Sequence, residues 1–319
     1  MHYVRDGTRP VVARAVPTKQ KASAVAKGSP DVQAQAANRP YRLTRVGVKG
    51  VKKPVTVHRP GHPPQGVVAT FDLFVDLPPS QKGTHMSRNL EALADILDEE
   101  TQGREDAGLE HLCSRLALRL LERHDYAGQA HVAAKADFFL GRKNPGGKRS
   151  VEAYGVLAEA EAQRGAGKAP TVMRRIGVEV VGMTACPCAM ETVRHRLGKK
   201  APVGVPVMTH NQRNRVTLKV EVPRGGDVEA SDLVDVCEAA LSAPTFELLK
   251  RGDEGDLVMQ AHANPRFVED VVREVLHRVR DRYRHLGAAA AVFVSSEAEE
   301  SIHKHNVYAE RLAALGELG

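Results

Sequence analysis

The sequence predicts an α+β fold in which antiparallel strands and pairs of helices alternate along one chain. Two periodicities support this prediction. Stretches in which β-branched and polar residues alternate are typical of strands, and stretches with an apolar residue every three or four positions are typical of helices. The order of elements, two strands, two helices and two strands, recurs in outline in the second half. With 42% hydrophobic and 27% charged residues, the 319-residue chain has a globular composition.

Residues 41–167 are predicted to form a first module. Pro78 and Pro79 end its second strand, and a stripe of leucines from Leu109 to Leu121 predicts its second helix. A glycine-rich stretch over 165–168 ends the module. The elements are predicted, in order, as strands over 45–58 and 65–77, helices over 87–99 and 108–124, and strands over 131–141 and 149–160.

Residues 168–319 are predicted to form a second module, with a metal site. The alternating run Arg215–Val222 predicts one strand, and the valines at 178, 180 and 181 predict another. The elements are predicted, in order, as a strand over 171–184, a short helix over 190–197, a strand over 215–222, helices over 231–250 and 265–285, and a strand over 289–295.

Residues 1–40 are predicted to be a disordered basic arm, because they are rich in Ala, Lys, Pro, Gln and Ser and lack periodicity. The net charge of +7 belongs to this end of the chain. Residues 1–60 hold 13 lysines and arginines against two acids, so the remaining body is mildly acidic. Only 4% of the residues are aromatic. We therefore expect no nucleic-acid partner.

The chain shows neither a run of about 18 apolar residues nor a secretory signal. Its four cysteines suit a protein whose thiols are kept for chemistry better than they suit a disulfide scaffold. We therefore expect a cytoplasmic protein with no membrane contact.

Cys186 and Cys188 flank one proline at the end of an apolar strand. One intervening residue is too short for a zinc-finger knuckle, which has two to four. One thiol is a candidate metal ligand and the other a candidate proton donor or nucleophile. The alternative is a buried pair of small apolar side chains.

Three further polar clusters are candidate sites, and each has a plainer alternative. The run Thr209–Arg213 offers an imidazole, two amides and a guanidinium, or it is a surface turn. Residues Gly83–Arg88 open a helix, where backbone N–H groups attract anions, or Thr84 or Ser87 simply caps it. The run Glu300–His305 holds two alternating histidines, which are otherwise exposed and inert. No phosphate-binding P-loop, dinucleotide fingerprint or serine nucleophile elbow occurs.

Six motifs, in this order, resemble the GTP cyclohydrolase IB family over residues 41–319. They are G-T-H-M-S-R at 83–88, C-P-C at 186–188, H-N-Q-R at 210–213, L-L-K-R at 248–251, N-P-R-F-V-E-D at 264–270 and E-S-I-H-K-H at 300–305. The resemblance implies the tunnelling fold, with two modules of antiparallel strands and helix pairs per chain that assemble into a multimeric β-barrel. It further implies a homotetramer with active sites at subunit interfaces.

The resemblance implies GTP as the substrate and hydrolytic opening of its imidazole ring, with release of formate. Bacterial members of the family make dihydroneopterin triphosphate. An archaeal iron(II)-dependent branch makes the 2′,3′-cyclic phosphate. The segments Ser242–Glu247 and Gly182–Ala185 look more like the archaeal branch. One divalent metal is implied per site, as iron(II), manganese or zinc.

Residue by residue, the resemblance implies that Cys186 and His210 are metal ligands. The family's carboxylate ligand falls at Pro244 here, so Glu247 is the nearest replacement and Glu300 a second candidate. Either glutamate would supply the carboxylate oxygen that the family's metal site contains.

For proton transfer the resemblance implies Cys188 and His303, with His305 beside them. For the phosphate side of the substrate we expect His85, Arg88 and Arg213.

One departure concerns the guanine base. The family grips the guanine edge with a glutamate, and Met259 stands at that position. A thioether cannot accept the paired N–H bonds of guanine. Either Glu254 or Asp256 takes over, or the substrate is a modified purine nucleotide, or the chain is a non-catalytic oligomeric purine-binding protein.

Overall fold

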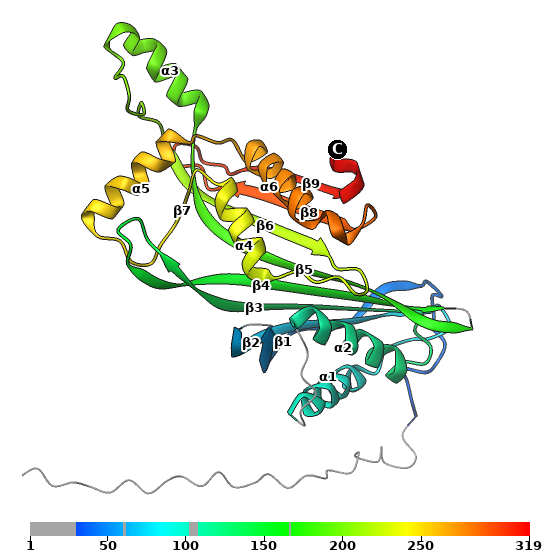
Figure 1. Cartoon of the computed structure of the whole chain (residues 1–319). Helices are drawn as coiled ribbons and strands as arrows, with labels where there is room; N and C mark the ends of the chain where they lie inside the picture. The colour runs from blue at the N-terminus through cyan, green and yellow to red at the C-terminus, as the bar shows by residue number, and fades with distance from the viewer. Residues whose placement is uncertain (1–29, 60–61, 102–107, 166) are drawn as a thin grey trace, which may run out of the picture.

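The computed structural model describes residues 30–59, 62–101, 108–165 and 167–319. Within these residues the strands form one antiparallel sheet in the order β1-β2-β3-β4-β5-β6-β8-β9, with β7 paired to β5 (Figure 1). The strands are β1 (Leu43–Arg59), β2 (His62–Leu77), β3 (Gln129–Lys143), β4 (Arg149–Gly165), β5 (Lys168–Ala185), β6 (Asn211–Glu221), β7 (Ala243–Pro244), β8 (Ala291–Ala298) and β9 (Val307–Ala314).

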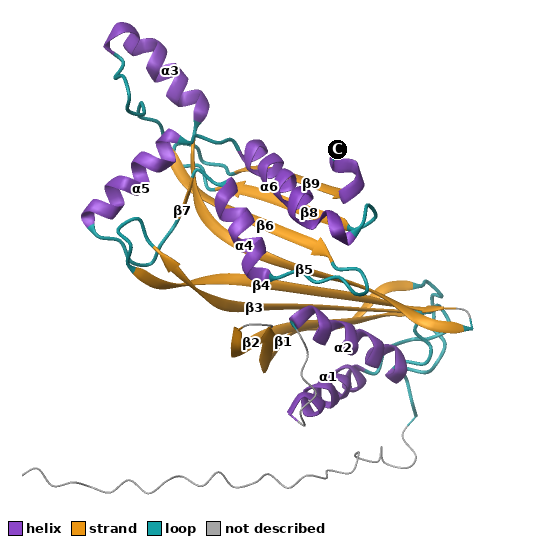
Figure 2. Cartoon of the chain, in the orientation of Figure 1, coloured by secondary structure: helices purple, strands orange, loops and turns teal. Residues whose placement is uncertain are grey.

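Six α-helices and three short 3₁₀ helices accompany these strands in the described part of the chain (Figure 2). They are α1 (Met86–Thr101), α2 (Leu109–Arg123), α3 (Pro187–Leu197), α4 (Ala230–Ala240), α5 (Arg251–Ala263), α6 (Val268–Tyr283), η1 (Gly198–Lys200), η2 (Arg284–Leu286) and η3 (Leu315–Leu318). None of these helices has the length and apolar character needed to cross a membrane.

The core lies between one face of the sheet and the helices α2, α4 and α6. Alternate strand residues are buried, as the periodicity of two requires. Val156 of β4 pairs with Val178 of β5, and both are buried, so the two halves of the chain bury the same face. Helix α2 contacts β3, β4 and β5, while α4 contacts β5 and α6 contacts β8. The predicted α+β class is confirmed, and the two halves share one core.

The other face of the sheet is polar. Its side chains pair across strands, with Lys135 of β3 bound to Glu179 of β5, and Lys219 of β6 bound to Glu159 of β4 at 2.5 Å. Salt bridges on such a surface contribute little stability individually. Their consequence is a sheet with one apolar face, covered by helices, and one charged face.

The predicted helix over 231–250 is wrong beyond Ala240. Helix α4 ends there, and Ala243 and Pro244 form β7 against Met183 and Gly182 of β5. Two physical reasons account for this. Pro244 lacks the N–H that a helix interior needs. Pairing between β4 and β5 also ends at Gly155 and Glu179. Beyond Glu179, the backbone N–H and C=O groups on that edge of β5 are available to pair with β7.

Besides β7, helix α5 and strand β9 of the second half have no counterpart among the predictions. Helix α5 follows β7, and strand β9 pairs with β8 along its whole length. The sequence of β9, V-Y-A-E-R-L-A-A, lacks apolar alternation, and Tyr308 and Leu312 are exposed. With β9 the second half has the same order of strand pair, helices and strand pair as the first.

Residues 1–29 of the predicted arm lie outside the described residues. Residues 30–40 lie against the loop before α1, where Gly83 N donates to Gln33 O at 3.1 Å and Lys82 N donates to Gln35 O at 2.8 Å. They contain no helix or strand.

Candidate active site

Antiparallel pairing of β5 and β6 brings Cys186 and His210 together. Ala185 pairs with Asn211 at the end of the two strands, so the residues just beyond them are neighbours. Cys186 N donates to His210 O at 3.0 Å, and Thr209 Oγ1 donates to Cys186 O at 2.8 Å. The backbone therefore fixes these two residues side by side.

Cys186 also begins helix α3. Its Sγ accepts a hydrogen bond from Ala189 N at 3.4 Å, as an N-cap side chain does, and Pro187 takes the first helical position. Cys188 lies one residue further on and is exposed. Figure 1 shows α3 projecting from this end of the sheet, so the two thiols lie at its base.

A chain of hydrogen bonds joins His210 to Glu300. His210 Nδ1 lies 3.0 Å from Gln212 Oε1, and Gln212 Nε2 donates to Glu300 Oε1 at 3.2 Å. Glu300 Oε2 lies 3.6 Å from His210 Nδ1. The His210 and Glu300 side chains are only 12% and 8% exposed, so this carboxylate and imidazole interact with little screening by solvent.

The connection between β8 and β9 adds two histidines. The ring centroids of His210 and His303 are 6.4 Å apart and meet edge to face, and those of His303 and His305 are 5.2 Å apart and stacked. Both added histidines are exposed. The structure thus brings Cys186, His210, Glu300, His303 and His305 to one end of the sheet.

The chemical types of these donors fit a divalent metal. A thiol, an imidazole and a carboxylate are ligands that zinc and iron accept. Their geometry does not complete a site, because within the described ranges no three His, Cys, Asp or Glu side chains are placed to bind one ion jointly. The described part of one chain therefore joins two donor residues, Cys186 and His210, through their backbones, without a third in coordinating position.

Glu247 lies away from this group. Thr245 Oγ1 donates to Val181 O at 2.9 Å, and Glu247 N donates to Glu152 Oε2 at 3.0 Å, so the segment runs along β5 away from Cys186. Glu247 instead lines a cavity of about 490 Å³ on the polar face.

Arg213 lines that same cavity, together with Arg215 and Lys135. Successive strand residues face opposite sides, so Arg213 points to the polar face while Gln212 points to the His210 side. The cavity also contains acidic side chains, among them Asp137 and Glu152. Its charge is therefore mixed, and it does not single out an anion.

Helix α5 carries the residues considered for guanine recognition. Glu254 lies in its first turn, and Asp256 follows; both are exposed. Met259 is 48% exposed on the same helix. The contacts of the described residues join none of the three to His210 or Cys186.

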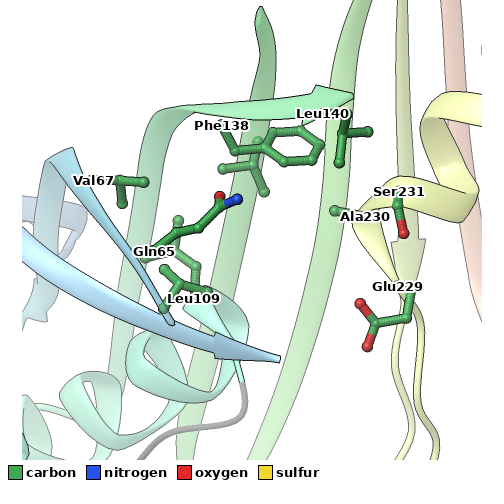
Figure 3. A pocket seen from close by; sticks show the side chains of 10 residues that line it. Gln65, Val67, Leu109, Phe138, Leu140, Glu229, Ala230 and Ser231 are labelled. Carbon is green, nitrogen blue, oxygen red and sulfur yellow. The ribbon is translucent and has the colours of Figure 1, made fainter. Parts of the chain in front are cut away.

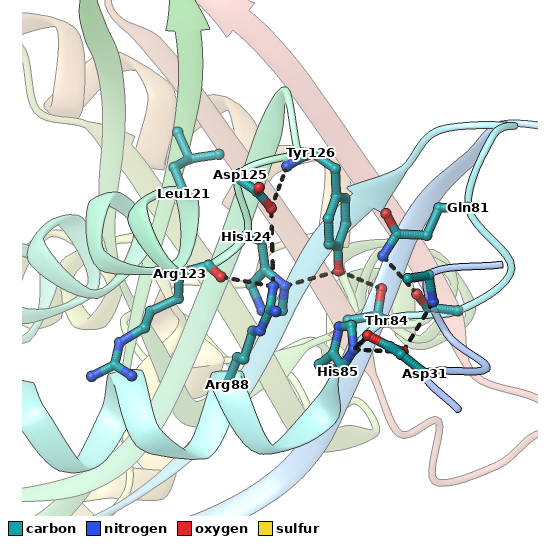
Figure 4. A network of polar contacts seen from close by, with 12 residues as sticks. Asp31, Gln81, Thr84, His85, Arg88, Leu121, Arg123, His124, Asp125 and Tyr126 are labelled. Atoms are coloured by element: carbon teal, nitrogen blue, oxygen red, sulfur yellow. Dashed lines mark hydrogen bonds and ion pairs between the residues drawn. The ribbon is translucent and has the colours of Figure 1, made fainter. Parts of the chain in front are cut away.

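His85 and Arg88 lie far from Cys186, in a separate network of polar contacts around the start of α1 (Figure 4). His85 Nε2 bonds the carboxylate of Asp31 at 3.0 Å, and Arg88 Nη1 donates to Arg123 O at 3.2 Å.

The separation follows from the strand register. β3 begins at Gln129, which pairs with Gln163, and Gln163 pairs with Thr171 of β5. From Thr171 to Ala185 the strand runs on the order of 45 Å at about 3.3 Å per residue. One chain therefore does not bring His85 and Arg88 to Cys186.

Buried polar groups hold the loop that carries His85. His124 is fully buried, with Nε2 2.8 Å from Asn89 Oδ1 and Nδ1 2.8 Å from Tyr126 OH. Tyr126 OH donates to Thr84 Oγ1 at 3.2 Å, beside His85. Burial, with a smaller contribution from the charge of Arg88, lowers the pKa of His124 to about 4 from its ordinary 6.5.

The low pKa of His124 predicts acid sensitivity. The unfolded chain takes up a proton near pH 6.5 and the folded chain does not, so stability is complete above that pH and falls as the pH drops toward 4. The expected loss is about 3 kcal/mol at 1.36 kcal/mol per pKa unit. Urea unfolding at several pH values measures it. His124→Gln, which removes the titrating ring and can keep a hydrogen bond to Asn89 Oδ1, should flatten the curve between pH 6.5 and 4, and an unchanged curve would contradict the assignment.

A small apolar hollow of about 50 Å³ separates the starts of α2 and α4 (Figure 3). Leu109, Phe138, Leu140 and Ala230 line it, with Glu229 among the few polar residues. It contains no histidine or cysteine and lies apart from both polar clusters, so we assign it to packing between the helix pairs.

Sequence reasoning did not single out two residues at the Cys186 end. Gln212 lies inside the H-N-Q-R motif, which was its available signal. His262 of α5 lies with Nε2 3.2 Å from Thr209 O and so supports the turn before His210. No local pattern marks His262, because its role arises from the packing of α5 against this turn.

The fold is α+β, and the polar cluster at one end of its sheet is the candidate active site. The family described as type I GTP cyclohydrolase folE2 matches residues 29–309. A GTP cyclohydrolase MptA of Methanothermobacter thermautotrophicus is 42% identical over 302 residues, which cover 91% of this chain and 94% of the relative. A GTP cyclohydrolase MptA of Methanospirillum hungatei is 43% identical over 303 residues, which cover 91% and 92%. The chain belongs to the type I GTP cyclohydrolase family.

Among solved structures, uricase from Arthrobacter globiformis superposes with a TM-score of 0.50 at 9% sequence identity, over 85% of this chain and 93% of the uricase. At that identity the likeness concerns the fold alone. It supports a tunnelling-fold-like arrangement, an antiparallel sheet with helices on one face, as the resemblance implied.

Proposed function

We propose that this chain is a metal-dependent GTP cyclohydrolase that opens the imidazole ring of GTP by hydrolysis and releases formate, leaving a dihydroneopterin phosphate. The observation that carries the proposal is the gathering of Cys186, His210, Glu300 and His303 at one end of the sheet. The similarity to relatives named GTP cyclohydrolase MptA supports the substrate.

We propose Cys186 and His210 as two ligands of one divalent ion, iron(II), manganese or zinc. Of the two candidate carboxylates, Glu300 lies beside His210, on its Nδ1 side, and Glu247 does not, so we propose Glu300 as the carboxylate of this site. When bound, such an ion lowers the pKa of a coordinated water so that hydroxide is available near neutral pH.

The remaining steps fall to the chain's own proton carriers. One water adds to C8, and one C8–N bond breaks to leave a formamide. A second water adds to C8, the other C8–N bond breaks, and C8 leaves as formate. The ribose then opens and rearranges, and the freed amine closes the pterin ring with loss of one water. Each ring nitrogen must gain a proton as its bond breaks. His303, stacked on His305 and facing the His210 ring, is placed to deliver one, and Cys188 at the base of α3 is a second donor.

The complete site would combine two chains in a homo-oligomer, with a tetramer as the expected form. His85 and Arg88 lie about a strand's length from Cys186 in their own chain, so they can meet substrate only at the Cys186 end of a neighbouring copy. They would bind the phosphates there. Arg213 lies on the polar face of β6, so it would contact the phosphates from that side. The open edges at β1 and β9 are the surfaces through which sheets could join into a barrel.

A related cyclohydrolase acting on a modified purine nucleotide is the second candidate function. Met259 favours it, since this side chain cannot accept the N–H groups of guanine, and Glu254 lies on the same helix as the alternative acceptor. With either substrate, GTP or a modified purine nucleotide, we expect the protein to act in the cytoplasm.

Anaerobic purification followed by incubation with GTP and iron(II), manganese or zinc tests the proposal. Formate release and the product mass are the measurements. A cyclic phosphate product would match the archaeal branch and a triphosphate the bacterial one. No turnover with any of the three metals would contradict GTP as the substrate.

A further inference from the structure

Gln212 lies between His210 and Glu300, the imidazole and the carboxylate of the proposed site. It is 9% exposed, on the buried face of β6. Its amide makes three contacts: Oε1 with His210 Nδ1 at 3.0 Å, and Nε2 with Glu300 Oε1 at 3.2 Å and Thr184 Oγ1 at 3.4 Å. Both ends of the amide are thus occupied.

The chemistry of these partners fixes the direction of the amide. Gln212 Nε2 donates to both Glu300 Oε1 and Thr184 Oγ1, so the NH₂ end of the amide faces these two oxygens. The oxygen end then faces His210 Nδ1. Since an amide oxygen also only accepts, His210 must carry its proton on Nδ1.

A neutral imidazole with its proton on Nδ1 has its lone pair on Nε2. Glu300 Oε2, 3.6 Å from Nδ1, adds an electrostatic preference for the same tautomer. The three residues therefore leave one nitrogen of His210, Nε2, free to bind a cation.

We propose that Gln212 is a positioning residue that holds His210 in the Nδ1–H tautomer and holds Glu300 beside it, so that His210 Nε2 is ready for a divalent cation. The inference rests on the proposed function in taking His210 as a metal ligand. Partners of ligating histidines commonly change metal affinity 10–100-fold when they are replaced.

Two substitutions separate the two roles of the amide. Gln212→Leu removes both the acceptor for His210 and the donor for Glu300. Gln212→Glu keeps an acceptor for His210 but repels Glu300. We expect Gln212→Leu to lose the tautomer preference and Gln212→Glu to keep it, and both to weaken the hold on Glu300.

The tautomer is measured without metal or substrate. Nitrogen-15 NMR of the His210 ring at about pH 8, above the ordinary imidazole pKa, reports which nitrogen carries the proton. We expect Nδ1–H in the unchanged chain and a mixture in Gln212→Leu. An Nε2–H tautomer in the unchanged chain, or no change in Gln212→Leu, would overturn the proposal.

Asn214→Leu is the matched control. It lies two residues along β6 on the same face and is buried, and its Oδ1 accepts from Ser296 Oγ at 2.9 Å, away from His210. It should lower the unfolding temperature through the lost hydrogen bond and leave the His210 tautomer unchanged. A tautomer change in this variant would show that general destabilisation explains the effect.

Zinc affinity, measured by competition with a coloured chelator, supplies the second readout. We expect Gln212→Leu to weaken zinc binding about 10–100-fold and Asn214→Leu to change it less than about twofold. Equal affinity in Gln212→Leu and the unchanged chain would refute the positioning role. If the unchanged chain binds no metal, the proposed function loses its cofactor, while the NMR result still decides whether Gln212 sets the tautomer.

Discussion

Replacing Cys186 with alanine should abolish metal binding and turnover together. The thiol lies beside His210 and caps α3, so the substitution removes a sulfur donor and leaves Ala189 N without its side-chain acceptor. Loss of an N-cap costs only about 1 kcal/mol, so the chain should still fold. Metal content after purification and formate release from GTP are the two measurements.

Cys237→Ala is the control for this variant. Cys237 is fully buried in the core, and burial raises its pKa well above the ordinary value, so it is an inert thiol. Its alanine variant should lose some stability through the smaller side chain and keep both metal and activity. Full activity in Cys186→Ala would sink the assignment of the site.

His303→Ala should lower kcat about 10²–10⁴-fold with little change in KM, the range typical of a lost general acid or base. The reason is its place beside the His210 ring and its exposure toward incoming substrate. Metal content should stay unchanged, which separates a proton carrier from a ligand. Formate release at saturating GTP measures the effect.

His277→Ala serves as the control for His303, because His277 is an exposed histidine on α6 that contacts Asp281 and Arg280 rather than the site. It should keep full activity. Loss of metal in His303→Ala would instead place His303 among the ligands, and unchanged kcat would remove it from the reaction.

The strongly periodic elements of the fold were predictable from sequence. The leucine stripe of α2 has a clear helical periodicity, and the residues of β2 and β6 alternate as in a strand. The structure confirms these three elements. β7 could not be predicted, because two residues show no period and the strand exists only where β4 leaves β5. β9 likewise depends on the edge that β8 offers.

The site was predictable to a similar degree. Its motifs contain Cys186, His210 and His303, which lie at one end of the sheet because β5, β6 and β8 are adjacent. Chain spacing could not decide between Glu247 and Glu300, since each follows a different strand. The sequence did not mark Gln212 as more important than its neighbours, because its partners Thr184 and Glu300 are 28 and 88 residues away in the chain.

The nearly sequential order of strands in the sheet has a consequence for synthesis. Each strand from β2 to β6 can pair with its predecessor as soon as it leaves the ribosome, and domains commonly fold from the N-terminus during translation. Glu300, His303 and His305 lie between the last two strands, β8 and β9. The strands up to β6 can therefore pair before Glu300, His303 and His305 have been translated, so the candidate site is completed only after most of the sheet has formed.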